Sequence, residues 1–453
     1  MQDTAQVTKF LASWIHSCQR SDVPKSVSDQ ALRTFFNWFG CAIGGARHET
    51  VDRAIQAVSP FSGPATSSVI GRPERTDALH AALLNGISSH VLDYDDTHLK
   101  TIIHPAGPVA SALLAVAEIR PVSGAELLHA MTIGIEVECR IGNAVYPDHY
   151  DQGWHITGTT GVFGAAAAVS KLIGLDQQKT IWALGLAATQ ASNLREMFGT
   201  MTKSFHPGRA AQNGAMAAFL AEAGFDSSER AIEAPRGFAN VLSTKQNYSE
   251  ITSGLGAVWE AELNSYKPFA CGIVIHPAID GCIQLSRDLG DRVNEIAAVE
   301  LETHPLVLEL TGKTEPSTGL ESKFSVFHAA AAALIKRDGA PTAFTDELVN
   351  DQSIISLRRK VRATISTTMH EDAVKIRIRL NDGTAVEKHV EHALGSLDRP
   401  LSNAQLDDKF VRQAALVVGN EEAVRLARLA WDFAATKDAG AIARETQMHD
   451  AHR

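Results

Sequence analysis

Runs of alanine and glycine constrain the fold of this chain more than any other feature. Apolar residues recur at helical spacing up to about residue 262, and small-residue runs occupy Gly164 to Ser170, Ala210 to Ala223 and Ala329 to Ala333. Small side chains let helix axes approach closely. Aromatic residues make up only 6% of the chain, which disfavours a β-sandwich. The sequence therefore predicts a mostly α fold with a large multi-helix domain.

Helix-boundary signals agree with this prediction. Ser123 to Glu126 and Asp226 to Glu229 have the pattern of capping boxes, and Asp176 is a candidate N-cap. Gly174 and Gly224 are candidate helix stops.

The pattern changes after about residue 263. Residues 298–303 and 360–367 alternate between apolar and polar, and residues 374–380 and 385–390 flank an Asn-Asp-Gly-Thr turn, which is a hairpin signature. Helical spacing returns from Ala404 through Ala435. We therefore expect a smaller α+β lid domain, residues 263–399, inserted into a helical domain formed by residues 1–262 and 400–453.

Composition and charge exclude several classes of function. The 453 residues include 42 Lys and Arg against 52 Asp and Glu, a net charge of −10, which disfavours a nucleic-acid surface. No run of about 20 apolar residues or N-terminal export signal is present, so we expect neither membrane insertion nor secretion. Five scattered cysteines without a C-x-x-C pair favour a reducing, cytoplasmic location.

The densest group of reactive side chains lies in residues 90–107, His-Val-Leu-Asp-Tyr-Asp-Asp-Thr-His-Leu-Lys-Thr-Ile-Ile-His-Pro-Ala-Gly. Predicted helices over residues 77–89 and 105–119 flank this segment, so we expect a loop anchored at both ends, a common place for catalytic groups. The plain alternative is a solvated acidic loop in which Asp96 or Thr97 caps a helix.

Two sharper alternatives concern phosphate chemistry. Asp93-x-Asp95-x-Thr97 matches the nucleophile motif of Mg²⁺-dependent haloacid-dehalogenase-type phosphatases, but that motif needs a β-strand before it and a βαβ repeat after it, and neither is predicted. Gly312-Lys313-Thr314 fails as a phosphate loop because Val307 stands where the first glycine is required.

A second cluster, residues 150–161, contains Tyr150 and His155 and opens an Ala-rich helix. A helix N-terminus disfavours a charged imidazolium, so His155 is expected to be neutral and able to act as a base. The alternative is a core histidine bonded to a backbone carbonyl.

A third cluster, residues 195–209, is expected to be a loop between helices, and Lys203, His206 and Arg209 are candidate ligands for a carboxylate or phosphate. The alternative is a solvated basic turn.

A fourth cluster, residues 266–277, places Lys267 and His276 at the expected domain junction, where they could close over a ligand. A zinc site built from His104, His155, His206, Cys271 or His276 is conceivable, but no close ligand spacing supports it.

In this order, the four clusters resemble the MmgE/PrpD superfamily over nearly the whole chain. The shared patterns are H-x-x-D-[FY]-D-D-T…H-P, [GF]-[FW]-H-x-T…G, G-x-x-x-K-x-x-H-x-G and K-P-[FY]…H-P. The resemblance implies a helical domain with a lid, a homodimer, and chemistry on small di- or tricarboxylates without a metal or other cofactor. Carried over by position, it implies that the cleft is lined by Asp93, Thr97, His104, His155, Lys203, Lys267 and His276.

The members of this superfamily make or protonate a carbanion next to a carboxylate. That chemistry requires a base and cations that hold the developing charge. His104 and His155 suit the acid and base roles, Lys203 and Lys267 suit charge stabilisation, Asp93 could fix a histidine tautomer, and Thr97 could bind a carboxylate oxygen.

We expect a lyase, with dehydration of the 2-methylcitrate type first. The segment around Tyr150 is similar to the epimerase branch, whereas the Asp-Asp-Thr97 triplet is similar to the lyases. His328 stands where the decarboxylase branch favours Tyr, which disfavours decarboxylation of cis-aconitate. A carboxylate-binding protein without turnover is the alternative outside the enzymes.

Overall fold

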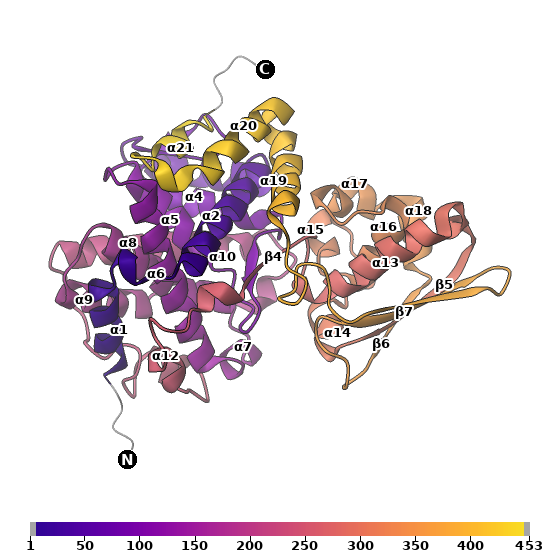
Figure 1. Cartoon of the computed structure of the whole chain (residues 1–453), viewed down its shortest axis with the longest axis horizontal. Coiled ribbons are helices and arrows are strands. Elements are labelled where there is room, and N and C mark those ends of the chain that lie inside the picture. The colour runs from indigo at the N-terminus through magenta and orange to yellow at the C-terminus, as the bar shows by residue number, and fades with distance from the viewer. Residues whose placement is uncertain (1–5, 448–453) are drawn as a thin grey trace.

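The structure is a computed structural model, and it describes residues 6–447. It consists of a large helical unit and a smaller unit that extends from one side of it (Figure 1). The smaller unit carries a four-stranded sheet, and the rest of the described chain is mainly helical. The predicted mostly α class is confirmed.

The large unit contains helices from both parts of the chain. They are α1 (Val7–Ser17), α2 (Lys25–Gly45), α3 (Glu49–Val58), α4 (Ala78–Val91), α5 (Ala106–Ala117), α6 (Gly124–Val145), α7 (Asp148–Asp151), α8 (Ile156–Leu172), α9 (Gln177–Ala188), α10 (Thr202–Glu222), α11 (Phe238–Leu242), α12 (Ser249–Thr252), α19 (Asn403–Val418), α20 (Asn420–Trp431) and α21 (Ala441–Arg444).

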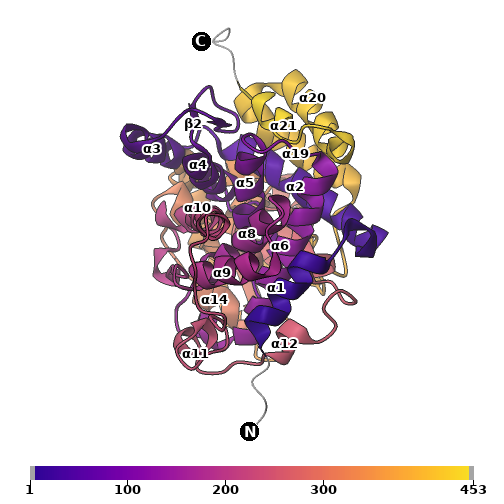
Figure 2. The same cartoon turned by 90° about the vertical axis from the view of Figure 1, so that its left-hand side faces the viewer.

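Helices α6 and α8 lie at the centre of the large unit, surrounded by α1, α5, α9 and α10 (Figure 2). Small residues permit this packing. A Cβ atom added to Gly134 of α6 would stand 2.7 Å from the carbonyl oxygen of Gly164 in α8, and one added to Gly214 of α10 would stand 2.5 Å from the Cβ of Ala165. Larger side chains would push these axes apart. The glycine and alanine runs are therefore the contact surfaces of the central helices.

The smaller unit pairs a sheet with helices. Strands β5 (Ile296–Thr303), β6 (Val361–Ile365), β7 (Val374–Leu380) and β8 (Ala385–Val390) lie in the order β6-β5-β7-β8, with only β5 and β6 parallel. One face is covered by helices (Figure 1). The helices of this unit are α13 (His276–Leu289), α14 (Pro305–Thr311), α15 (Gly319–Ser322), α16 (Val326–Lys336), α17 (Asp346–Val349) and α18 (Gln352–Arg358).

The expected hairpin is present, because β7 and β8 pair antiparallel across Gly383, whose φ is +89°. In β7 the burial alternates strictly, so one face of the strand packs on the core and the other faces solvent.

Two separate hydrophobic cores underlie the two units. The first contains residues from Val7 to Tyr266 and again from Leu401 to Ala443. The second consists mainly of residues from Phe269 to Val390. Helix α19 packs on α2, so the end of the chain returns to the large unit. The proposed boundaries near residues 262 and 400 agree with this arrangement but stay predictions.

Most capping predictions hold, with one exception. Ser123 and Glu126 form a capping box at α6, Asp176 caps α9, and Gly174 and Gly224 follow α8 and α10 with positive φ. The capping box predicted at Asp226 to Glu229 is wrong, because no helix begins there. Instead, the Ser227 hydroxyl donates to the carbonyl of Trp182, which ties this loop to α9.

Four further short strands form two separate pairs. β1 (Ser67–Ser68) pairs with β2 (Arg75–Thr76), and β3 (Asp96–His98) pairs with β4 (Asn264–Tyr266). Within residues 6–447, no helix is both long and apolar enough to cross a membrane.

Candidate active site

A small cavity lies where the two units meet. From the large unit it is lined by Asp93, Ile102, His104, Tyr150, His155, Phe198 and Lys203, and from the junction and the small unit by Lys267, Gly272, Ile273, Val274, Leu310, Thr311 and Phe324. Its volume is about 40 Å³, whereas small-molecule sites typically measure roughly 300–1,000 Å³. Residues from six separate segments of the chain therefore converge on a space that they almost fill.

The acidic part of the first cluster, residues 93–97, is buried, which excludes the alternative of a solvated acidic loop. Asp93, Asp95, Asp96 and Thr97 are all at most 2% exposed. The expected loop also contains strand β3, whose partner β4 leads directly into Lys267. Asp96 does contribute to the start of α5, because its carboxylate accepts a hydrogen bond from the backbone N–H of Ala106.

Asp93 holds two lysines in the cavity. Its Oδ1 atom accepts hydrogen bonds from Nζ of Lys267 at 2.6 Å and from Nζ of Lys203 at 2.9 Å. Burial raises the pKa of Asp93, but the two ammonium groups outweigh burial and hold that pKa well below its usual value. One carboxylate thus faces two cations, and the cavity keeps a net positive charge.

The two lysines differ in how firmly they are held. Burial lowers the pKa of both, but for Lys267 the attraction of Asp93 prevails and the pKa is raised, whereas for Lys203 the pKa stays lowered. The shorter contact of Lys267 agrees with this difference. Lys203 is therefore the ammonium more easily released to another anion.

Lys323 is a third buried cation near Asp93, and the sequence analysis did not select it. Its Nζ donates to the carbonyls of Leu92 and Ala270, and within residues 6–447 it forms no ion pair with a carboxylate. Burial lowers the pKa of Lys323 to about 8. A lysine next to the Phe-Ser start of α16 was visible in the sequence, but nothing there indicated that its side chain crosses to the large unit.

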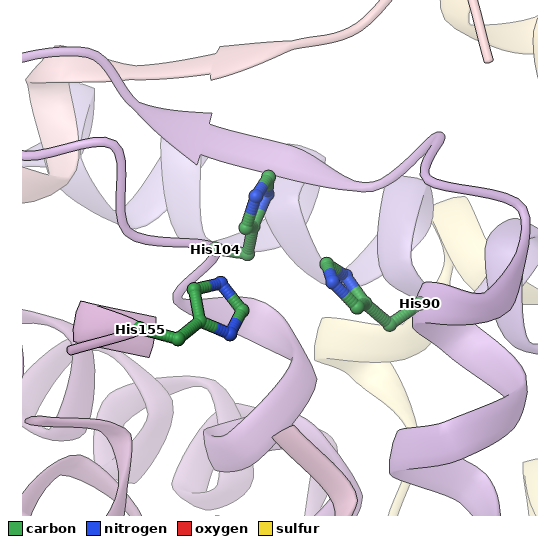
Figure 3. Close-up of side chains that lie close together, drawn as sticks. All are labelled: His90, His104 and His155. Atoms are coloured by element: carbon green, nitrogen blue, oxygen red, sulfur yellow. The ribbon is translucent and has the colours of Figure 1, made fainter. Parts of the chain in front are cut away.

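Three imidazoles lie together beside the cavity (Figure 3). His90 ends α4, His104 precedes α5, and His155 precedes α8. The centroids of the His90 and His104 rings are 4.8 Å apart, and His155 lies within 6.3 Å of both. Burial lowers the pKa of each, which keeps all three neutral.

Hydrogen bonding fixes the tautomer of His104. Its Nδ1 lies 2.8 Å from the carbonyl oxygen of Asp96, which can only accept, so Nδ1 carries the proton. The Nε2 atom then keeps its lone pair. His104 lines the cavity, so this lone pair is available as a base.

His155 stands at the N-cap position of α8, as the sequence predicts, but among the described residues its imidazole is not bonded to a backbone carbonyl. Its Nδ1 lies 2.8 Å from Nδ1 of His206, so one imidazole donates to the other. His206 itself does not line the cavity and lies behind His155. Burial lowers the pKa of His206 to about 3, so this pair is neutral.

Tyr150 reaches the cavity from α7 and is 3% exposed. The guanidinium of Arg195 stacks on its ring at 3.9 Å from the centroid. Burial raises the pKa of Tyr150, so its hydroxyl stays protonated at neutral pH.

Some predicted residues do not reach this cavity. Thr97 and His276 line a second, larger cavity of about 380 Å³, which shares only Ile102, Ile273 and Val274 with the first. Thr97 nevertheless lies close behind the site, because its hydroxyl is 3.3 Å from Nδ1 of His104.

Only the first part of the third cluster, residues 195–201, lies outside an α-helix, so the expected loop is wrong for residues 202–209. Helix α10 begins at Thr202 and continues through Pro207, so Lys203, His206 and Arg209 stand on its first two turns. Arg209 is exposed and donates to Gln212. Its guanidinium therefore points away from the cavity that Lys203 enters.

His328 does not reach the cavity either. It is fully buried inside the small unit, where its Nε2 lies 2.9 Å from the carbonyl oxygen of Ala343. Its replacement of a tyrosine therefore carries no argument against decarboxylation.

The described residues include groups that could hold a metal ion. His90, His104 and His155 each offer one nitrogen, and these atoms lie within 4.8 Å of one another. His90, Asp93 and Asp95 form an overlapping group of the same kind. Three neutral imidazoles are a common ligand set for zinc, so the metal-free expectation needs a direct test.

A haloacid-dehalogenase-type site is excluded by the surroundings of Asp93. The residue follows helix α4, has a φ of 51°, and binds two lysines. No doubly wound parallel sheet exists within residues 6–447. The carboxylate lacks the strand-tip position that this chemistry requires.

Comparisons with known proteins agree with this arrangement. The MmgE/PrpD N-terminal domain matches residues 9–251, and the MmgE/PrpD C-terminal domain matches residues 269–433. Cis-aconitate decarboxylase of Aspergillus terreus is 27% identical over 92% of this chain and 91% of its own. The human protein of the same name is 27% identical over 90% of this chain and 88% of its own. A probable 2-methylcitrate dehydratase of Saccharomyces cerevisiae is 22% identical over 86% and 81%. With both domain models matched across the two units that enclose the cavity, the chain belongs to the MmgE/PrpD family.

Proposed function

We propose that this protein is a lyase that acts on a small di- or tricarboxylate by removing or adding a proton next to a carboxylate. One observation carries the proposal: a single carboxylate, Asp93, faces two lysines beside a neutral imidazole with a free lone pair. Such a site attracts anions and can accept a proton. The relatives named above are lyases, a decarboxylase and a dehydratase, which supports this class.

In the proposed reaction, an anionic substrate displaces Lys203 from Asp93 and binds it through a carboxylate. Lys267 stays with Asp93, and Lys323 adds a third positive charge from the small unit. These charges stabilise the enolate that forms when the C–H bond breaks.

The proton passes to Nε2 of His104, and the electron pair of the C–H bond stays on the substrate. In a dehydration the β-hydroxyl then leaves as water after protonation, for which His155 is the nearest candidate. In a decarboxylation, the C–C bond breaks, CO₂ leaves, and the electron pair stays on the substrate carbon. That carbon then receives a proton that Nε2 of His104 has taken from solvent.

We place dehydration of a 2-methylcitrate-type hydroxy acid first. Decarboxylation of cis-aconitate is the second candidate, favoured by the higher identity to the decarboxylases, 27% against 22%. Epimerisation of the iminodisuccinate type is a third, because Tyr150 offers a protonated hydroxyl in the same cavity.

The small unit is proposed to act as a lid. The cavity of about 40 Å³ is too small for a six-carbon acid, and its walls come from both units. Separation of the units would open it from the side of the larger cavity, across Ile102, Ile273 and Val274. A homodimeric state and a cytoplasmic location stay predictions from the sequence.

The test is incubation of the purified protein in D₂O with 2-methylcitrate, cis-aconitate and iminodisuccinate in separate reactions, followed by NMR. Loss of water, loss of CO₂ or exchange with inversion identifies the reaction. Binding without loss of water, without loss of CO₂ and without exchange of any C–H would replace the lyase with a carboxylate-binding protein.

A further inference from the structure

A buried carboxylate that does not line the cavity lies behind two of the imidazoles. Oδ2 of Asp95 lies 2.7 Å from Nδ1 of His90, and Oδ1 of Asp95 lies 3.7 Å from Nδ1 of His104. The side chains of Asp95 and His90 are both 0% exposed. Burial raises the pKa of Asp95, but the hydrogen bond with His90 and the positive charge of Lys267 hold that pKa below its ordinary value, so the carboxylate is ionised.

This contact fixes the tautomer of His90. An ionised carboxylate only accepts hydrogen bonds, so Nδ1 of His90 carries the proton and Nε2 keeps a lone pair. That Nε2 atom is buried and has no hydrogen-bond partner among the described residues. A buried polar nitrogen without a hydrogen-bond partner reduces the stability of the fold unless a ligand or a reaction in the site uses that nitrogen.

The geometry points to Asp95 as a positioning residue for the proposed proton transfer: it holds His90 in one tautomer and supplies the counter-charge for His104. The inference rests on the proposed function. When the substrate C–H bond breaks, the proton binds Nε2 of His104, which becomes an imidazolium, and the electron pair remains on the substrate carbon. The proton on Nδ1 stays there, and Asp95 stays ionised.

Other groups do not fill this role. Asp93 is engaged by Lys203 and Lys267. The side chain of Asp96 points elsewhere, because its Oδ2 accepts from Asn264 and from the backbone of Ala106. Asp95 is therefore the carboxylate whose two oxygens approach two of the three clustered imidazoles, His90 and His104.

The experiment compares the full-length protein with Asp95→Asn, using Asp96→Asn as a matched control at the next position. ¹⁵N NMR of histidine-labelled protein at pH 7 reports which nitrogen of His90 is protonated, and His90→Gln assigns that signal. We expect a single Nδ1–H tautomer in the wild type and in Asp96→Asn, and a tautomer mixture in Asp95→Asn. A mixture in the wild type, or no change in Asp95→Asn, would overturn the inference.

Turnover provides the second measurement, with 2-methylcitrate and cis-aconitate as probes. Asp95→Asn should lower kcat by about 10²–10⁴-fold, the range for loss of proton transfer or of its orienting carboxylate. KM should stay within twofold, because Asp95 does not line the cavity. An unchanged kcat, or a rise in KM that accounts for the loss, would refute the positioning role.

The two measurements separate the inference from the proposed function. If the wild type turns over neither probe, the proposed function fails, while the NMR result still supports or overturns the hold of Asp95 on His90. If Asp95→Asn does not fold, His90→Gln takes its place: a fall in kcat of at least tenfold at unchanged KM supports the arrangement, and wild-type kcat overturns it.

Discussion

Replacement of Gly208 by alanine should test whether the close contact between α4 and α10 positions the site. A Cβ atom at Gly208 would stand 2.3 Å from the carbonyl oxygen of Leu83 in α4, whereas ordinary contact begins at 3.4 Å, so the two backbones must separate by about 1.1 Å. Overpacking of this kind costs about 1–3 kcal/mol of unfolding free energy.

The same displacement should reduce catalysis. His90 lies near the end of α4, and Lys203 lies in the first turn of α10. Separation of the two helices therefore moves the His90 imidazole relative to the Lys203 ammonium. A misplacement of about 1 Å can lower turnover by about 10²-fold. We therefore expect a lower melting temperature together with a kcat, per folded molecule, that is lower by about two orders of magnitude.

The assay combines thermal unfolding with kcat on the substrate identified in D₂O. Gly224→Ala is the matched control, because Gly224 has a φ of +90° and no atom within 4 Å of an added Cβ. Backbone strain should destabilise that variant by about 1 kcal/mol without moving the site. A Gly208→Ala variant that is destabilised but keeps wild-type kcat would refute the reasoning.

Further predictions address the chemistry, metal dependence, pH dependence and lid. His104→Gln and His155→Gln should each lower kcat by about 10²–10⁴-fold, and Lys203→Met should raise KM more than it lowers kcat; wild-type kcat in both histidine variants would remove the proposed site. Dialysis against a strong chelator should leave turnover unchanged, and activity that zinc restores would instead assign a metal to His90, His104 and His155. Burial lowers the pKa of His276 to about 3. Below about pH 6.5 this imidazole is therefore protonated in the unfolded state but stays neutral in the folded state, so the free energy of unfolding decreases as the pH is lowered. His276→Gln should therefore lose about 2 kcal/mol less than the wild type between pH 7 and pH 5 in urea titrations; equal losses would contradict the buried neutral imidazole. A bound substrate analogue should slow hydrogen exchange in residues 266–277, and equal exchange with and without ligand would argue for a rigid site.

The local pattern of the sequence determined the helices and the hairpin. Ala and Gly runs mark helices that must pack closely, and the contacts of Gly134 and Gly214 show that they do. Apolar and polar residues alternate on both sides of the turn Asn381 to Thr384. This pattern predicts β7 and β8, because the strand period and the turn chemistry depend only on neighbours in the chain. The four reactive clusters were also visible, because ionisable residues stand out against apolar helices.

What only the tertiary structure decided is the direction in which each side chain points. Lys203 and Arg209 are six residues apart on α10, about 240° around its axis, so one enters the cavity and the other faces solvent. Pro207 and Gly208 hid that helix, because both residues usually end or interrupt one.

The same reason explains the residues that sequence analysis missed or misplaced. His276 lines a different cavity from Lys267, although both belong to one short motif. Lys323 finds its partners, Leu92 and Ala270, in distant segments, where no sequence pattern pointed to them. Asp95 contacts His90 and His104 of its own segment, but only the folded loop brings its two oxygens toward both imidazoles. A sequence lists reactive groups in order, whereas long-range packing determines which of them share one buried space and one set of charges.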